Sequence, residues 1–225
     1  MTEQKQPIRR LGRGALVFLS IVAVVAGIWL GLLYYGGGLG TKSNAMHLKA
    51  ATLLPQPKPL ADFTLTDQDN RPLGRDDLKG HWTFVAFGYT RCPDICPTLM
   101  ATFDAVQKDL AKSGSGPQPS FLFVSVDPER DTPEQLGKYV GYFNPHIRGA
   151  TAGHEVLRPL TAQLGVLYQR SESKETAMGY LVDHSASILL LDPQARLAAI
   201  FSTPHDPHKI AGDFRAIAEH GEPTP

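Results

Sequence analysis

The chain has 225 residues, with 22 basic and 22 acidic side chains and therefore a formal net charge of zero. Hydrophobic residues make up 42% of it, which excludes wholesale disorder because such a composition can supply a core. The balanced charge excludes a basic nucleic-acid-binding domain. Two cysteines are too few for a disulfide-stapled miniprotein or a four-sulfur zinc site, but they are enough for one disulfide, redox pair or metal pair.

The N-terminal region predicts a membrane anchor. No charged residue occurs between Gly14 and Thr41, and the apolar run 15–35 is long enough, as a helix, to span a hydrocarbon core of about 30 Å. The basic residues of the short segment 1–14 predict a cytoplasmic N-terminus. A cleaved signal peptide is the alternative, but its apolar region is usually shorter and ends at a small-residue cleavage site. We therefore expect a single transmembrane helix in a bacterial inner membrane, with the remaining chain in the periplasm.

Beyond this helix the sequence predicts a linker and one domain. Residues 36–59 are rich in glycine at their start and in proline at their end, as is typical of a linker, and residues 60–225 form the domain. Apolar patterning predicts strands at 62–66, 82–87 and 121–126, helices at 98–112, 154–164 and 207–220, and a terminal hairpin from 187–191 and 196–201. Thr132, Pro133 and Gln135 fit an N-cap, a first helical position and a capping box. The alternation predicts an α/β fold, compatible with a thioredoxin-like one among others.

The two cysteines lie in the segment GYTRCPDICP, between a predicted strand and a predicted helix. Pro97 fits the first position of that helix, so we expect both Cys92 and Cys96 on a tight loop at its N-terminus. Unpaired backbone N–H groups and the helix dipole stabilise thiolate over thiol at such a place. Thiolates attack disulfides and bind metal ions, and a structural disulfide is a further alternative.

A metal site would need another ligand. His184 precedes a predicted strand, and His205 and His208 form a weaker candidate pair in a turn. Met100 is a soft ligand type, but its helical spacing from Phe103 favours core packing. Two thiolates with one imidazole suit Cu(I), accept Cu(II) with an added oxygen or water, and also suit zinc. The ligand types alone do not choose the metal.

Three segments, GYTRCPDICP, SVDPERDTPE and VDHSASILLLDP, closely resemble in this order the Sco/SenC family of membrane-tethered copper proteins. The resemblance covers residues 54–218 and implies a thioredoxin-like fold behind the transmembrane helix. It also implies Cys92, Cys96 and His184 as copper ligands and a role in assembling the binuclear copper centre of cytochrome c oxidase. The implied partners are the copper-centre subunit of the oxidase, another periplasmic copper carrier and a thioredoxin-like reductant.

The family motif also places two carboxylates near the site. We expect Asp127 in a second layer, where an acid can orient a ligand or a partner, and Asp131 in a structural role beside the start of the following helix. Three positions depart from the family pattern, namely Arg91 in place of an aromatic residue, Leu189 in place of tyrosine and Ala195 in place of glycine. Arg91 brings a positive charge beside the thiols, which bears on redox potential and partner choice.

Two functions of different classes remain open at this point. A copper chaperone would hold copper through Cys92, Cys96 and His184 and pass it by ligand exchange to an oxidase subunit. A thiol–disulfide oxidoreductase would attack a disulfide with Cys92 and resolve the mixed disulfide with Cys96, either on the cysteines of the oxidase or in redox signalling. A peroxidase and a purely structural membrane-anchored binder are weaker alternatives. We expect copper delivery, with thiol–disulfide exchange as the enzymatic alternative.

Overall fold

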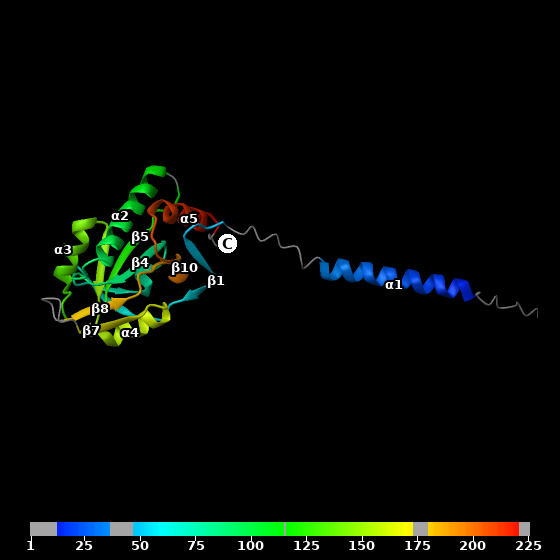
Figure 1. Cartoon of the computed structure of the whole chain (residues 1–225), viewed down its shortest axis with the longest axis horizontal. Coiled ribbons are helices and arrows are strands. Elements are labelled where there is room, and N and C mark those ends of the chain that lie inside the picture. Colours follow the sequence, from blue (N-terminus) through cyan, green and yellow to red (C-terminus); the bar gives the residue numbers. More distant parts are fainter. Residues whose placement is uncertain (1–12, 37–46, 115, 173–179, 221–225) are drawn as a thin grey trace, which may run out of the picture. The chain divides into compact units, whose positions relative to one another are not determined.

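A computed structural model describes residues 13–36, 47–114, 116–172 and 180–220 (Figure 1). The chain divides into two compact units, Met1–Met46 and His47–Pro225. The described helices are α1 (Arg13–Gly36), the 3-10 helix η1 (Arg75–Leu78), α2 (Ile95–Ser113), α3 (Pro133–Phe143), α4 (His154–Gln163) and α5 (Pro207–His220). The described strands are β1 (Ala51–Pro59), β2 (Thr64–Asp67), β3 (Pro72–Gly74), β4 (Thr83–Gly88), β5 (Ser120–Ser125), β6 (Ile147–Thr151), β7 (Tyr168–Glu172), β8 (Tyr180–His184), β9 (Ile188–Leu191) and β10 (Arg196–Phe201).

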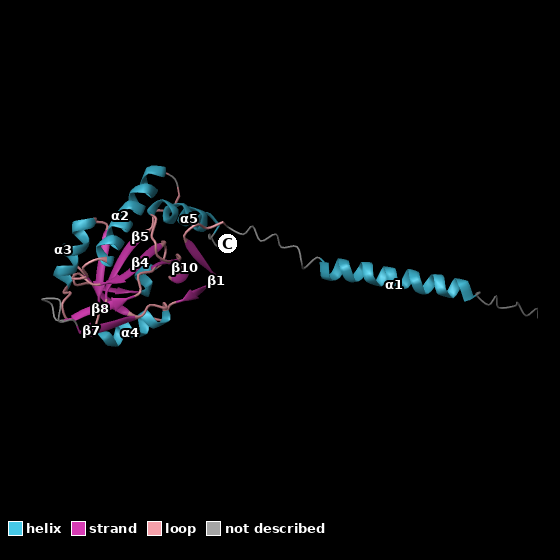
Figure 2. Cartoon of the chain, viewed as in Figure 1, coloured by secondary structure: helices cyan, strands magenta, loops and turns pink. Residues whose placement is uncertain are grey.

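The second unit is built on a mixed sheet of eight strands in the order β1-β10-β9-β4-β5-β6-β2-β3. Its centre, β4-β5-β6, is parallel, and β9 joins β4 in the antiparallel sense. In Figure 2, α2 and α5 lie on one side of this sheet and α4 lies on the other. β7 and β8 pair only with each other, as a separate antiparallel ribbon. The architecture confirms the predicted α/β class.

The core lies between the central strands and the helices beside them. Every residue of β4 and of β9 is buried, as expected for central strands covered on both faces and for the continuous apolar runs in their sequences. Phe84 of β4 stands at the middle of an aromatic cluster that joins α2, β5, β10 and α5 through Phe103, Phe121, Phe201 and Phe214. This core holds β4 rigidly, and the chain that follows β4 carries the cysteines.

The end of the predicted linker is instead part of the sheet. Residues 51–59 form the edge strand β1, paired with β10, and the unit that contains it begins at His47. The pairing register shifts between Leu53 and Lys58, around the first two prolines. Proline lacks the N–H that a central strand needs, but it is tolerated at an edge or a bulge, so a proline-rich segment still joins the sheet here. Residues 37–46 of the predicted linker lie outside the described residues.

Most other predicted elements occur within a few residues of their expected bounds. The terminal hairpin is β9 with β10, and the capping box of α3 forms between Thr132 and Gln135. The strands β6, β7 and β8 were not expected. Their sequences, IRGAT, YQRSE and YLVDH, carry charged residues and little apolar alternation, so local pattern does not reveal them.

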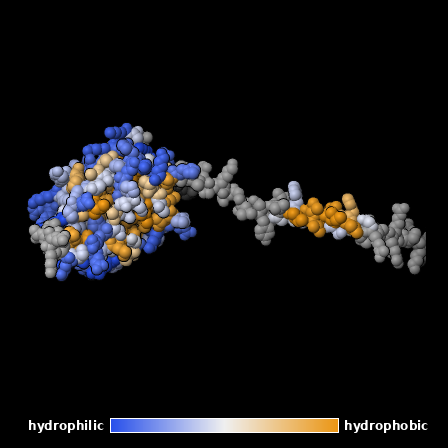
Figure 3. All heavy atoms as spheres, in the orientation of Figure 1, coloured by the Kyte–Doolittle hydropathy of each residue, from blue (hydrophilic) through white to orange (hydrophobic). Residues whose placement is uncertain are grey.

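The described part of the first unit is the helix α1, and Figure 3 shows apolar residues along it. Its large apolar side chains from Val17 to Leu30 are all exposed in the structure. Within the described part of the chain, no helix meets the combined length and hydropathy needed to cross a membrane. The transmembrane helix at 15–35 therefore stays a prediction. The segment 1–14, which the sequence predicts to be cytoplasmic, falls almost entirely outside the described residues.

Candidate metal centre

The two cysteines occupy different positions at the start of α2. Cys92 lies in the loop after β4, and its backbone N–H donates to the Tyr89 carbonyl over 3.2 Å. Cys96 lies in the first turn of α2, which begins at Ile95 after the N-cap Asp94. The expectation that Pro97 opens the helix and leaves both cysteines on a loop is wrong by two residues. The first turn contains N–H groups without intrahelical partners, so proline is tolerated at its third position as well as its first.

His184 completes a group of three ligand atoms. It is the last residue of β8, and its Nε2 lies 3.2 Å from the Cys96 Sγ. The backbone N–H of Cys96 donates to the Cys92 Sγ over 3.4 Å. The ligand atoms of the three side chains lie within 4.8 Å of one another, with both cysteines buried and His184 half-buried. Among the described residues this is the one group of three potential ligands close enough to share an ion.

The second nitrogen of the imidazole is also held. His184 Nδ1 lies 3.1 Å from the backbone carbonyl of Ser185. When Nδ1 carries the hydrogen it donates to this carbonyl, which leaves the lone pair of Nε2 directed toward the cysteines. Histidines that bind metal ions are commonly oriented in this way by a backbone carbonyl. The donor set of two sulfurs and one oriented imidazole fits a soft metal ion such as Cu(I).

The two thiols ionise very differently. A hydrogen bond from Cys96, with a further one from His184, lowers the pKa of Cys92 to about 4 although burial opposes the shift. The same hydrogen bond and burial raise the pKa of Cys96. The reduced, metal-free pair therefore carries one thiolate, on Cys92, and one thiol, on Cys96. Proximity to the N-terminus of α2 favours the same charge on Cys92, because backbone N–H groups point toward its sulfur.

Gly88, the last residue of β4, is a site residue that the sequence analysis missed. A Cβ atom at this position would lie 2.6 Å from the Cys96 Sγ and 2.8 Å from the ring of Phe123. Only glycine leaves room for Cys96 to pack this closely against the strand. A glycine at a strand end immediately before the cysteine loop was the available signal, but many glycines have that position without such a role.

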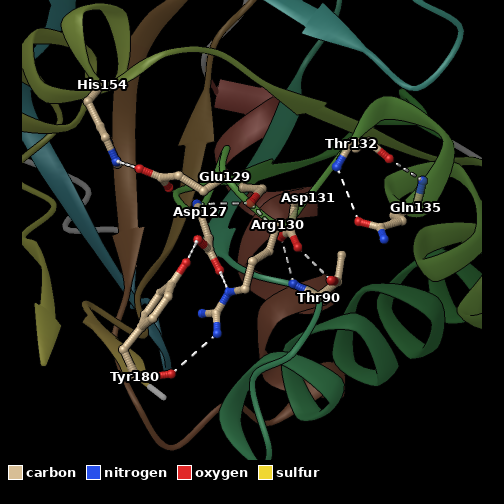
Figure 4. Close-up of polar contacts among 10 residues, drawn as sticks. Thr90, Asp127, Glu129, Arg130, Asp131, Thr132, Gln135, His154 and Tyr180 are labelled. Carbon is tan, nitrogen blue, oxygen red and sulfur yellow. Dashed lines mark hydrogen bonds and ion pairs between the residues drawn. The ribbon is translucent and has the colours of Figure 1, made fainter. Parts of the chain in front are cut away.

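Asp131 holds the cysteine loop in place, as Figure 4 shows. Its carboxylate accepts hydrogen bonds from the Thr90 N–H at 2.8 Å, from the Thr90 hydroxyl at 2.6 Å and from the Ser125 hydroxyl at 2.6 Å. Burial raises the pKa of Asp131, and these donors oppose that rise. The structural role expected for Asp131 is found, but its side chain supports the loop two residues before Cys92 rather than the start of α3.

Asp127 lies one layer further from the sulfurs. It is buried, forms an ion pair with Arg130 and accepts a hydrogen bond from the Tyr180 hydroxyl at 2.8 Å (Figure 4). None of the hydrogen bonds and ion pairs found in the described ranges joins it directly to the cysteines or to His184. The carboxylate of Asp127 therefore reaches the site through Arg130 and Tyr180, while its backbone is linked to Asp131 and the Ser125 hydroxyl.

The other candidate ligands lie elsewhere. His205 hydrogen-bonds the Phe201 carbonyl at 3.1 Å, and His208 pairs with Asp109 at 3.0 Å. Met100 is fully buried in the core face of α2, as its helical spacing predicts. Arg91 is exposed beside the cysteine loop.

Comparison with known proteins agrees with this geometry. The family model of SCO1/SenC matches residues 53–219. This chain belongs to the SCO1/SenC family. The mitochondrial Protein SCO1 homolog 1 of Arabidopsis thaliana is 35% identical over 144 residues, which cover 64% of this chain and 42% of that protein. The SCO2-like protein of Rickettsia felis is 30% identical over 194 residues, which cover 86% of this chain and 94% of that protein. The chain thus matches less than half of the plant protein and nearly all of the bacterial one.

Solved structures of the SCO1/SenC family share the fold. The crystal structure of Arabidopsis thaliana ScoI with copper bound aligns with a TM-score of 0.66 at 31% identity, covering 72% of this chain and 98% of that one. Bradyrhizobium japonicum ScoI with copper bound aligns with a TM-score of 0.61 at 32% identity, covering 69% and 96%. BsSco, described as a member of the Sco family of cytochrome c oxidase assembly proteins, shares the fold with a TM-score of 0.58 at 20% identity, covering 75% and 98%. The fold is therefore thioredoxin-like, as the sequence motifs imply.

Proposed function

We propose that this protein is a copper chaperone that binds one copper ion through Cys92, Cys96 and His184. The observation that carries the proposal is the convergence of these three ligand atoms within 4.8 Å, from a loop, a helix start and a strand end. Two sulfurs and an imidazole are a soft, low-coordinate set suited to Cu(I), and an added oxygen would accommodate Cu(II). Copper-bound structures of two family members support the choice of copper over zinc.

The same site favours transfer of the metal ion. His184 is half-buried at the end of a two-stranded ribbon, so an incoming ligand can replace it more readily than the buried sulfurs. We propose as recipient the copper-centre subunit of cytochrome c oxidase, which the family's association with oxidase assembly supports. A second periplasmic copper carrier would supply the metal ion. A thioredoxin-like reductant would keep Cys92 and Cys96 reduced, because cysteines joined in a disulfide cannot bind copper as thiolates.

We also propose that the protein is held at a bacterial inner membrane. The apolar run 15–35 would hold the copper domain at the periplasmic face of a bacterial inner membrane as a single-pass anchor with a cytoplasmic N-terminus. The SCO2-like protein of Rickettsia felis, whose match covers 86% of this chain, supports a bacterial setting.

An anaerobic Cu(I) titration of the reduced chain against a competing chelator tests the proposed ligands. We expect one tightly bound copper per chain and, in His184→Ala, an affinity lower by roughly 100-fold or more, since even the loss of a residue that only orients a ligand costs about 10–100-fold. His205→Ala is the matched control, because His205 is also partly buried and hydrogen-bonded to a carbonyl but lies outside the cluster. Equal affinity in His184→Ala and the wild type would remove His184 from the ligand set.

The unequal ionisation of the two cysteines favours thiol–disulfide exchange as a second function. The Cys92 thiolate would attack a target disulfide, and Cys96, after losing its proton, would then displace the target's second sulfur. The chain is left with a Cys92–Cys96 disulfide, and the target gains two electrons as a dithiol, taking one proton from Cys96 and one from water. Exchange does not need the imidazole as a metal ligand, so His184→Ala should largely retain exchange while losing copper affinity.

A further inference from the structure

Arg130 is a buried cation close to the candidate metal site, and it is not one of the proposed copper ligands. Its side chain is only 10% exposed, and it forms an ion pair with Asp127, whose side chain is 1% exposed. Among the described residues its Nη2 has no hydrogen-bond partner. Burying a guanidinium costs desolvation free energy, so a buried arginine is stable only when several contacts offset that cost.

One set of contacts fixes Tyr180, the first residue of β8. The guanidinium carbon lies 3.6 Å from the centroid of the Tyr180 ring, and Nη1 donates to the Tyr180 carbonyl over 3.3 Å. Asp127, held by Arg130, accepts from the Tyr180 hydroxyl. The carbonyl and hydroxyl of Tyr180 are therefore held by the Asp127–Arg130 pair, as the dashed lines in Figure 4 show. Its ring lies against Arg130 and also against Arg170 of β7, each with the guanidinium carbon 3.6 Å from the ring centroid.

Arg130 also contacts the cysteine side of the site. Its guanidinium carbon lies 5.6 Å from the centroid of the buried Tyr89 ring. Tyr89 in turn packs edge-to-face on the His184 imidazole, with ring centroids 6.0 Å apart, and its carbonyl accepts from the Cys92 N–H. Arg130 thus lies against the residue that begins the cysteine loop and against the strand that ends at the histidine.

The topology explains why such a contact is needed. His184 ends β8, and β8 pairs only with β7, so no ladder of backbone hydrogen bonds attaches it to the eight-stranded sheet that carries the cysteines. A two-stranded ribbon is marginally stable alone, so side-chain contacts, together with the short link 185–187 to β9, must set its position. We propose that Arg130 is a positioning residue that fixes the distance between the His184 imidazole and the cysteine pair, an inference that rests on the proposed copper site.

The decisive experiment is a double-mutant cycle on Cu(I) affinity in the reduced full chain. Arg130→Met keeps an unbranched apolar stem but removes the guanidinium with its charge, its stacking and its donors. We expect it to weaken Cu(I) binding by about tenfold, as for other residues that orient a metal ligand. In the His184→Ala background we expect Arg130→Met to have no further effect, because the ligand that it positions is then absent. An equal loss in both backgrounds would overturn the proposal, since it would show general destabilisation.

Two further variants separate positioning from stability. Arg196→Met is the control, because Arg196 also forms an ion pair with a buried aspartate, Asp192, in the β9–β10 turn. This turn is far from the site: Leu191 of β9 pairs with Thr83, the first residue of β4, whereas the cysteine loop follows the last residue of β4. We expect Arg196→Met to leave Cu(I) affinity unchanged. Arg130→Lys keeps the charge near Asp127 without the planar stacking, and we expect an intermediate affinity. If both single variants, Arg130→Lys and Arg130→Met, bound Cu(I) with the wild-type affinity, the proposal would be overturned.

A copper-free measurement keeps this inference distinct from the proposed function. In the reduced protein we expect a nuclear Overhauser contact between the Tyr89 ring and the His184 imidazole, retained in Arg196→Met and weakened in Arg130→Met. The same contact at full strength in Arg130→Met would show that Arg130 does not position His184. If instead His184→Ala binds copper like the wild type while the Overhauser contact still depends on Arg130, the copper-ligand proposal fails and the positioning role stands.

Discussion

Cys92 and Cys96 are the same residue type, four positions apart, yet the fold gives them different chemistry. Cys92 lies on the loop and receives the N–H of Cys96, whereas Cys96 is buried between Gly88 and the imidazole of His184. One sulfur therefore carries negative charge and the other holds a proton. At the scale of single residues, this asymmetry prepares the pair both for thiol attack and for coordination with loss of one proton.

The low pKa of Cys92 predicts its reactivity toward iodoacetamide as a function of pH. An acid with a lowered pKa keeps its charged form to lower pH, so with a pKa of about 4 Cys92 is a thiolate throughout the range from about pH 5 to about pH 8. Its alkylation rate should be nearly flat across that range, whereas an ordinary thiol gains roughly tenfold per pH unit below its pKa. Mass spectrometry of the reduced, copper-free chain would follow the modified site.

Cys96→Ala provides the control for this profile. The variant removes the largest cause of the lowered pKa of Cys92, so the thiolate should appear at higher pH than in the wild type. A rate that climbs steeply with pH in the wild type, or an identical profile in Cys96→Ala, would refute the ionisation described here.

At the scale of elements, β1 and α5 are joined by a single carboxylate. The buried Asp213 of α5 accepts the backbone N–H groups of three consecutive residues, Lys49, Ala50 and Ala51, at 2.6–2.9 Å. These contacts join residues more than 160 positions apart and fasten the start of β1 to the end of the chain. They explain why a proline-rich segment, with few ladder bonds of its own, becomes the edge of the sheet.

Asp213→Ala should therefore destabilise the domain and β1 in particular. It leaves several backbone donors without a partner, and each buried donor left unsatisfied costs about 1–3 kcal/mol, so we expect the free energy of unfolding to fall by roughly 3 kcal/mol. Urea denaturation measures this fall, and hydrogen exchange should show the loss of protection concentrated in residues 51–59. Asp62→Ala, at an exposed ion pair with Arg75, should cost less than about 1 kcal/mol. Similar stability for the two variants would disprove the role of Asp213.

At the scale of the whole molecule, the chain joins an apolar helix to a compact copper domain that begins at His47. The three candidate ligands Cys92, Cys96 and His184, and the proposed positioning residue Arg130, all lie in the second unit. We therefore expect residues 47–225 to bind Cu(I) with the affinity of the full chain, and we expect the first unit to decide only where the protein is held.

Membrane extraction tests the anchor. In bacterial cells the full chain should sediment with the membranes and resist alkaline carbonate, because the apolar run 15–35 would remain in the bilayer. A version without residues 1–46, exported by an unrelated cleavable signal peptide, should be recovered in the soluble periplasmic fraction. Release of the full chain by carbonate would refute the anchor.

Local pattern in the sequence was sufficient for the α/β class, the buried strands around β4 and β5, the terminal hairpin and the capping box of α3, because these depend on residues close together in the chain. The sequence motifs predicted Cys92 and Cys96 at the start of a helix, and the family resemblance indicated His184 as the third ligand. β6, β7, β8 and the paired form of β1 escaped prediction, since strands with polar or proline-rich sequences are stabilised by their neighbours.

The tertiary structure alone decided how the site is assembled. His184 lies 88 positions from Cys96, and no local pattern specifies that Nε2 comes within 3.2 Å of the sulfur. The same is true of the space that Gly88 leaves for Cys96, of Asp131 beneath the cysteine loop and of Arg130 between Tyr89 and Tyr180. The contacts of His184 and Arg130 arise from the packing of a separate ribbon against the rest of the domain, and those of Gly88 and Asp131 from the packing of α2 and the cysteine loop against the sheet. Packing depends on the shapes of side chains distant in sequence. The sequence by itself thus determined which residue types were available for the chemistry, whereas only the packed fold brought them into contact.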